Sequence, residues 1–245
     1  MTGHLLVVGA QRCGTTYLHA LLDAHPEITM ARPARPEPKV FCSDEVTHRG
    51  VEWYHDTYFG HAGAERLLGE KSTSYLEDAD APGRAAEVLR DAHIVVLLRD
   101  PVARAVSNWR FSSSHGMETR PLQVALRDSL VAEAPWDRGL TSVSPFAYLT
   151  RGRYVEYLEP WTAAFPATTH VLFLEELVEE HRGLDGLWSA LGVDPSLAPR
   201  RPDRALNRSD GEAPALDADL SGMLGAYFED SRRALAARLG RELPW

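Results

Sequence analysis

The most informative stretch of the sequence is a glycine-containing loop near its start, residues 9–16, Gly-Ala-Gln-Arg-Cys-Gly-Thr-Thr. Glycine lets the backbone turn tightly, so that successive N–H groups can converge on an anion. Arg12 adds a fixed positive charge inside the loop, and Thr15 and Thr16 add hydroxyl donors where a helix should begin. The pattern therefore favours a phosphate-binding loop over a ligand-free turn from strand to helix.

This loop departs at one position from the nucleoside-triphosphatase pattern G-x-x-x-x-G-K-[ST]. Thr15 stands where that pattern has the lysine that reaches the β- and γ-phosphates, and the fixed cation comes earlier, at Arg12. A small-molecule kinase of the P-loop class, dependent on ATP and Mg²⁺, stays an alternative, but Thr15 speaks against it.

A second candidate anion site follows a buried apolar run at residues 94–98. Arg99 comes at the carboxyl end of this predicted strand, the edge where open α/β sheets bind ligands. Ser107 lies about two turns into the helix that should follow. The planar guanidinium of arginine matches phosphate oxygens, although Arg99 taken alone could form a surface salt bridge instead. Two such segments suggest one ligand with two separated phosphates.

The elements that position these residues are strands alternating with helices. The loop 32–39 contains three prolines and should be irregular, and residues 69–75 read as a strand end that enters a loop. The alternation predicts a parallel sheet with helices on both faces, in a single domain over residues 1–245. Clear strands are predicted at 5–8, 94–98 and 171–174, and helices at 14–24, 51–59, 85–92, 121–132, 147–164, 183–191 and 216–239.

The composition narrows the class of protein. With 26 basic and 35 acidic residues the formal net charge is −9, which argues against a general nucleic-acid or anionic-membrane binder. Cys13 and Cys42 lack CxxC spacing, so neither a disulfide framework nor a zinc site is expected. The first residues lack a basic leader, and no apolar run approaches the about 20 residues of a membrane helix. We therefore expect a cytoplasmic enzyme with no membrane insertion.

Two motifs together resemble a known family. Residues 9–18 resemble the 5′-phosphosulfate-binding motif of sulfotransferases that use 3′-phosphoadenosine-5′-phosphosulfate (PAPS), and residues 98–109 resemble their 3′-phosphate-binding motif. The chain looks most like the carbohydrate branch, which includes heparan sulfate sulfotransferases and many bacterial relatives. Further segments similar to that branch are residues 36–41, 69–76, 151–154, 207–209 and 239–245.

The resemblance implies a P-loop-type α/β fold and direct in-line transfer of a sulfonate to an acceptor hydroxyl, with PAPS as co-substrate and no metal. It implies Glu37 as the base, and Arg12 and Lys71 as cations that stabilise the transition state. Taken alone, Glu37 could be a solvated loop acid, and Lys71 a surface lysine paired with Glu70. The nucleotide-binding residues implied by the resemblance are Arg12, Cys13, Gly14, Thr15, Thr16, Arg99, Ser107 and Arg208.

The chain also departs from the family pattern. The phosphosulfate loop commonly has lysine at the position of Arg12, the residue before Glu37 is Pro36 instead of lysine, and some relatives carry histidine at Lys39. A non-catalytic nucleotide-binding module of the same fold is a further alternative, which the presence of Glu37 and Lys71 beside both motifs disfavours. The acceptor implied is a carbohydrate or a small natural product.

Overall fold

The computed structural model describes residues 2–137, 144–179, 183–199 and 215–245. The chain divides into two compact units. The first contains residues 1–98 and 157–207, and the second contains residues 99–156 and 208–245. This division does not test the single domain expected over residues 1–245, which stays a prediction.

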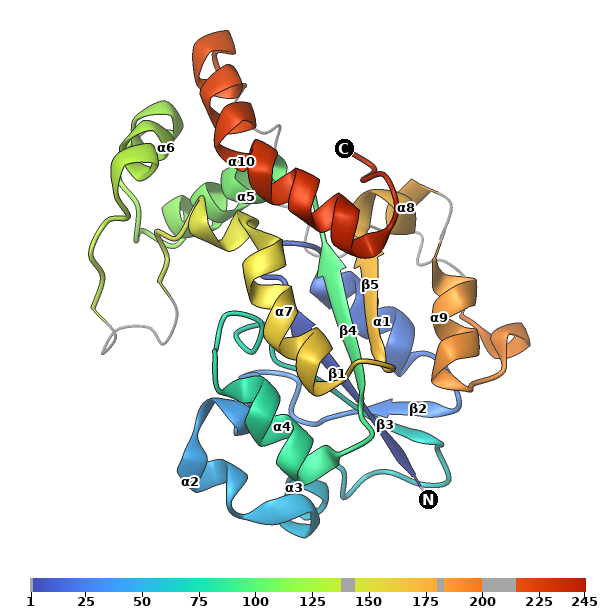
Figure 1. The fold of residues 1–245 in the computed structure, drawn as a ribbon. Coiled ribbons are helices and arrows are strands. Elements are labelled where there is room, and N and C mark those ends of the chain that lie inside the picture. Colours follow the sequence, from blue (N-terminus) through green and yellow to red (C-terminus); the bar gives the residue numbers. More distant parts are fainter. Residues whose placement is uncertain (1, 138–143, 180–182, 200–214) are drawn as a thin grey trace. The chain divides into compact units, whose positions relative to one another are not determined.

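The first unit is built on a five-stranded sheet in the order β2-β3-β1-β4-β5, with every neighbouring pair parallel (Figure 1). All five strands therefore end at the same edge. The apolar runs predicted as strands at 5–8 and 94–98 are confirmed and are buried, as expected for a sheet that is covered on both faces. The run predicted at 171–174 lies in a strand that ends at Phe173 and is only partly buried. The strands are β1 (Gly3–Gly9), β2 (Ile28–Met30), β3 (Leu67–Lys71), β4 (His93–Leu98) and β5 (Thr169–Phe173).

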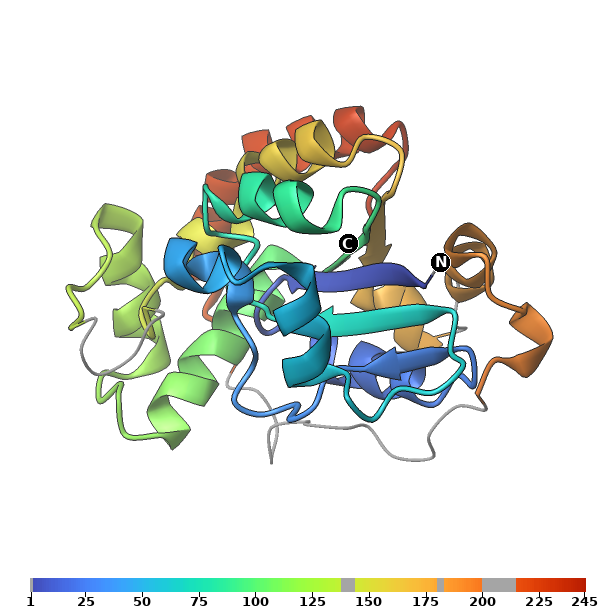
Figure 2. The same ribbon diagram turned by 90° about the horizontal axis from the view of Figure 1, so that it is seen from below.

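Helices of the first unit cover both faces of this sheet (Figure 2). Helix α1 (Thr15–Asp23) packs its apolar face on one side, in a cluster that includes Leu5 and Val7 of β1 and Trp188 of α9 (Leu184–Leu191). Helix α4 (Ala81–Leu89) lies on the other side. Further helices of this unit are η1 (Val40–Cys42), α2 (Asp44–Thr47), α3 (Gly50–Tyr58), α8 (Leu174–Glu179) and η3 (Pro195–Leu197).

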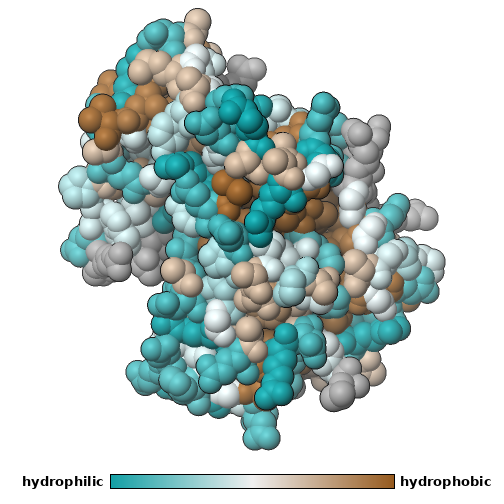
Figure 3. Space-filling view, in the orientation of Figure 1, coloured by the Kyte–Doolittle hydropathy of each residue, from teal (hydrophilic) through white to brown (hydrophobic). Residues whose placement is uncertain are grey.

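The second unit is helical, with α5 (Pro101–Ser114), α6 (Leu122–Val131), η2 (Thr150–Gly152) and α10 (Ala218–Leu239). Its apolar core joins α5, α6 and α10. Hydrophobic side chains remain exposed over α6 (Figure 3), where Val131 is 91% exposed. Among the described residues, no helix is both long enough and apolar enough to cross a membrane.

One predicted helix differs at its start. The sequence pattern predicts a helix over 147–164, but α7 runs only over Tyr154–Ala164. The buried guanidinium of Arg104 donates to the carbonyl oxygens of Ala147 and Tyr148, and Asn108 and Ser112 donate to that of Pro145. These side chains of α5 occupy carbonyls that an α-helix would pair with its own amides. The chain before α7 therefore forms only the short 3-10 turn η2 and no α-helix.

Two pairs of histidines lie in the first unit. The Nε2 atoms of His4 and His55 are 2.8 Å apart, and Nδ1 of His93 is 3.1 Å from Nε2 of His170. Burial, followed by the charge of His55, lowers the pKa of His4 to about 4. Burial also lowers the pKa values of His93 and His170. In each pair one ring must accept a hydrogen bond, so the folded state favours neutral imidazole.

These pairs predict that the protein loses stability in mild acid. Between about pH 6.5 and about pH 4, His4 binds a proton in the unfolded chain and not in the folded one, so the free energy of unfolding falls as the pH falls. We expect a loss of about 2 kcal/mol from His4 between pH 7 and pH 5. Urea unfolding at pH 7 and pH 5 checks this loss. His4→Gln should make the free energy of unfolding depend less on pH, and His48→Gln, at an exposed histidine, should not. Equal slopes in both variants would contradict this account.

Candidate active site

The glycine loop follows β1 at the carboxyl edge of the sheet, as predicted. The amide of Ala10 donates to the carbonyl of Leu97 in the neighbouring strand, at 2.9 Å. Arg12 and Gly14 both have positive φ, 68° and 84°, which turns the loop sharply before α1. A Cβ on Gly14 would be strained by its positive φ, and it would lie 2.6 Å from Cδ1 of Leu174, so the end of that side chain would have to move.

Helix α1 begins immediately after this turn, with Gly14 as its N-cap and Thr15 as its first residue. No side chain caps it, so its first amides are directed toward the loop. Cys13 and Thr15 are buried, and Arg12 and Thr16 are half-buried. A helix N-terminus next to a guanidinium and hydroxyls is suited to bind a phosphate or sulfate group.

A second cluster, which we call the carboxylate cluster, contains Glu37, Lys71 and Thr73. The ammonium group of Lys71 forms a short ion pair with the Oε1 atom of Glu37. The amide of Thr73 donates to Oε2 of Glu37 at 2.9 Å, and its hydroxyl donates to the same oxygen at 3.1 Å. The side chains of Lys71 and Glu37 are 10% and 18% exposed, so the cluster is largely shielded from solvent yet reachable.

The carboxylate cluster lies at the same sheet edge as the glycine loop. Lys71 pairs with Val7 in the parallel register of β3 and β1, and the amide of Leu76 donates to the carbonyl of Val8 at 2.9 Å. A Cβ on Gly9 would lie 2.7 Å from the Cβ of Leu76. The segment after β3 therefore packs directly against the start of the glycine loop.

The alternative role for Lys71, a surface pair with Glu70, is wrong. Glu70 is fully buried, whereas Lys71 pairs with Glu37. Adjacent residues of a strand point to opposite faces, which separates the two side chains.

Sequence reasoning missed two residues near this cluster. Thr73 was not assigned a role, although it makes three hydrogen bonds to Glu37. His19 of α1 was also missed. Burial lowers its pKa, and the charges of Asp23, Lys71 and Glu37 act on it as well.

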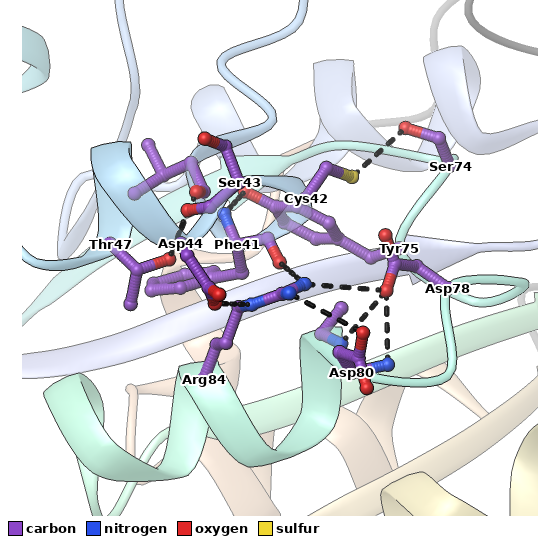
Figure 4. Close-up of polar contacts among 12 residues, drawn as sticks. Phe41, Cys42, Ser43, Asp44, Thr47, Ser74, Tyr75, Asp78, Asp80 and Arg84 are labelled. Carbon is purple, nitrogen blue, oxygen red and sulfur yellow. Dashed lines mark hydrogen bonds and ion pairs between the residues drawn. The ribbon is translucent and has the colours of Figure 1, made fainter.

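The segment that carries Glu37 is fixed to the residues after β3. Figure 4 shows Arg84 of α4 donating to the carbonyl oxygen of Phe41 at 3.4 Å and to the carboxylate of Asp44 at 2.6 Å. The amide of Phe41 donates to the hydroxyl of Tyr75 at 3.2 Å. These contacts hold the irregular chain after Glu37 in one place, although it has no regular ladder of its own.

The second predicted anion segment lies in the second unit. Asp100 caps α5 by accepting from the amide of Ala103 at 2.7 Å, and Pro101 is the first helical residue. Arg99 and Ser107 are half-buried, and the carbonyl oxygen of Arg99 accepts from the hydroxyl of Tyr154 at 2.8 Å. Arg208 lies outside the described residues.

The family model of the sulfotransferase domain matches residues 2–183. The chain belongs to the sulfotransferase family. The match covers the glycine loop, the carboxylate cluster and the segment with Arg99 and Ser107. Within the described part of the chain, no group of three or more His, Cys, Asp or Glu side chains could hold a metal ion.

Two curated sulfotransferases show how the chain relates to this family. It is 29% identical over 269 residues to the bifunctional heparan sulfate N-deacetylase/N-sulfotransferase 3 of Mus musculus, covering 98% of this chain and 30% of that protein. It is 30% identical over 180 residues to the mouse heparan sulfate glucosamine 3-O-sulfotransferase 3B1, covering 73% of this chain and 43% of that protein. The chain thus spans less than half the length of either relative.

Solved sulfotransferase structures share the fold. The crystal structure of a sulfotransferase from Alicyclobacillus acidocaldarius superposes with a TM-score of 0.78 at 24% identity, over 99% of this chain and 98% of that one. Mouse sulfotransferase SULT7A1 complexed with PAP gives a TM-score of 0.54 at 13% identity, over 95% of this chain and 85% of that one. The expected P-loop-type sheet with helices on both faces is therefore confirmed.

Proposed function

We propose that this protein transfers a sulfonate group from PAPS to a hydroxyl group of a carbohydrate or small natural product. The observation that carries the proposal is the carboxylate cluster at the carboxyl edge of the sheet, next to a loop suited to bind phosphosulfate. A structural carboxylate would need no adjoining anion site. A plain anion site would need no carboxylate, because a negative charge there opposes binding.

Each residue of the site has one task in the transfer. Glu37 accepts the proton of the acceptor hydroxyl while that oxygen forms a bond to sulfur. The bond between sulfur and the 5′-phosphate oxygen breaks in the same step, and adenosine 3′,5′-bisphosphate (PAP) leaves with the electron pair. Lys71 and Arg12 offset the negative charge that develops on the sulfonate oxygens and the leaving phosphate. No covalent enzyme intermediate is required.

The residues around the glycine loop suit the phosphosulfate end of the nucleotide. Arg12, Thr15 and Thr16 supply a cation and hydroxyl donors, and Cys13 and Gly14 supply backbone. We assign the 3′-phosphate to Arg99 and Ser107, with Arg208 as a further candidate from the sequence. Mouse sulfotransferase SULT7A1, which shares the fold, was solved with PAP.

We infer the class of acceptor from the names of the relatives and not from the geometry of the site. The names of the curated relatives include an N-sulfotransferase and a 3-O-sulfotransferase of heparan sulfate. An acceptor panel should therefore contain sugars with free hydroxyls, sugars with free amines, and non-sugar alcohols.

The decisive experiment is transfer of radiolabelled sulfate from PAPS across this panel, with and without EDTA. A parallel reaction offers radiolabelled ATP and Mg²⁺ as the donor instead. PAPS-dependent labelling that EDTA does not abolish supports the proposal. Transfer that requires ATP and Mg²⁺ would instead indicate a kinase. Tight PAP binding without any transfer would indicate a non-catalytic module.

Gly14 offers a test of the phosphosulfate loop. Gly14→Ala is expected to lower the affinity for PAP about tenfold, because a side chain at φ +84° is strained and its Cβ must displace Leu174. Gly50→Ala is the matched control, since Gly50 has φ +80° and no atom within 4 Å of its Cβ position. Calorimetry with PAP and thermal unfolding of both variants measure the effect. If the two variants bind PAP equally well, the loop assignment fails.

A further inference from the structure

Glu70 is a buried acid that the proposed chemistry does not use. It is fully buried in β3, directly before Lys71, and its side chain points away from the carboxylate cluster. A charged carboxylate in a protein interior is costly unless its oxygens are well paired. Its presence behind the site calls for an explanation.

Three hydroxyl groups surround this carboxylate. Ser72 and Tyr75 both donate to its Oε1 atom, at 2.6 and 2.7 Å, and Tyr54 donates to Oε2 at 2.7 Å. All three donors are themselves buried. Burial raises the pKa of Glu70, while the hydrogen bonds from Ser72, Tyr75 and Tyr54 lower it. Within the described residues, the carboxylate forms no ion pair, so these hydroxyls compensate for its burial.

Two of these hydroxyls also accept a hydrogen bond from the segment that carries Glu37. The amide of Lys39 donates to Ser72 Oγ at 2.9 Å, and the amide of Phe41 donates to the Tyr75 hydroxyl at 3.2 Å. Each hydroxyl therefore has a fixed direction: it accepts from a loop amide and donates to Oε1 of Glu70. Tyr54 comes from α3 and donates to the other oxygen. Its ring lies 5.9 Å from that of Phe41, but no hydrogen bond is seen between the Tyr54 hydroxyl and the loop in the described part of the chain.

The last residue of β3 and the chain that follows it thus contact the Glu37 segment with side chains that alternate between the two faces. Lys71 and Thr73 bind the Glu37 carboxylate, while Ser72 and Tyr75 bind the backbone two and four residues further on. Residues 71–75 therefore fix both the Glu37 side chain and the backbone of its segment. A shift of the backbone at Lys39 or Phe41 would move the carboxylate relative to the acceptor.

We propose that Glu70 is a positioning residue that holds Glu37 in place by orienting the hydroxyls of Ser72 and Tyr75. The inference rests on the proposed role of Glu37 as the base. The inference assigns to the buried carboxylate an effect on the chemical step and none on nucleotide binding. A base misplaced by about 1 Å can cost about 100-fold in rate.

The test compares two tyrosine variants that remove one hydroxyl each from the same carboxylate. Tyr75→Phe should lower kcat about tenfold and leave KM for PAPS and the affinity for PAP within about twofold. Tyr54→Phe should leave kcat within about twofold. Ser72→Ala should resemble Tyr75→Phe. Glu70→Gln should lower kcat less than either, because the oxygen of an amide has two lone pairs and can still accept from both hydroxyls.

Amide hydrogen exchange supplies a readout that needs no activity. Tyr75→Phe should speed exchange at Phe41, and Ser72→Ala at Lys39, whereas Tyr54→Phe should change neither. The inference is overturned if Tyr75→Phe and Ser72→Ala match Tyr54→Phe in both kcat and exchange. If instead exchange changes as expected but Glu37→Gln keeps full turnover, then Ser72 and Tyr75 do hold the Glu37 segment in place. In that case the assignment of Glu37 as the base is what fails.

Discussion

Glu37→Gln is expected to lower kcat about 1,000-fold, within the range that a positioned general base contributes. The substitution keeps the size of the side chain but replaces the carboxylate by an amide, whose oxygen is too weak a base to take the proton. The affinity for PAP should stay within about threefold, because Glu37 contacts Lys71 and Thr73 and not the glycine loop. Single-turnover sulfate transfer and calorimetry with PAP measure the two quantities separately.

Glu45→Gln is the control for this experiment. Glu45 lies in α2 on the same stretch of chain, its side chain is 88% exposed, and it pairs only loosely with Arg49 at 3.7 Å. Its replacement removes the same charge and should leave kcat unchanged. Turnover that persists in Glu37→Gln at more than about a tenth of the original rate would exclude Glu37 as the base.

Lys71→Met should lower kcat about 100-fold, since the proposed function assigns to Lys71 the role of a fixed cation at the reacting centre. The aliphatic stem of methionine keeps most of the packing of lysine. We expect the loss to appear in kcat more than in KM, because the charge that Lys71 offsets develops only during transfer. Steady-state kinetics with varied PAPS resolve the two parameters.

Arg66→Met is a matched control at the opposite end of the same strand. Arg66 directly precedes β3, and its side chain is 62% exposed beside Glu27. The variant changes the net charge equally but at the far edge of the sheet, so its kcat should not change. An equal loss in Arg66→Met and Lys71→Met would show that overall charge, and not the site, is responsible.

The glycine loop and the carboxyl ends of the strands could be predicted because they depend on local sequence. A buried apolar run followed by glycines and a helix start fixes where an anion site can form, and Asp100 with Pro101 fixes the start of α5. Helix α4 begins four residues earlier than predicted, since Pro82 and Gly83 are tolerated in its first turn. Strand β2 was missed because three residues are too few to show a period.

The partners of Glu37 could not be predicted, since they depend on how an irregular loop folds back. Thr73 is 36 positions away from Glu37, and no periodicity links a proline-rich loop to a strand end. The same holds for Glu70, whose three hydroxyl partners come from α3 and from the chain after β3. In the sequence, Glu70 and Lys71 are simply neighbours. The alternation of side chains along β3 buries Glu70 on one face and directs Lys71 toward Glu37 on the other.

That alternation makes the length of β3 a constraint on how related chains can diverge. Inserting or deleting one residue within β3 would exchange the sides of Glu70 and Lys71, sending a carboxylate toward that of Glu37 and an ammonium group among buried aromatic rings. Close packing adds to this, since the sulfur of Met30 lies 2.3 Å from where a Cβ of Gly69 would stand. Differences in chain length between relatives should therefore accumulate in the connection between α3 and β3, residues 59–66, and leave the strand unaltered.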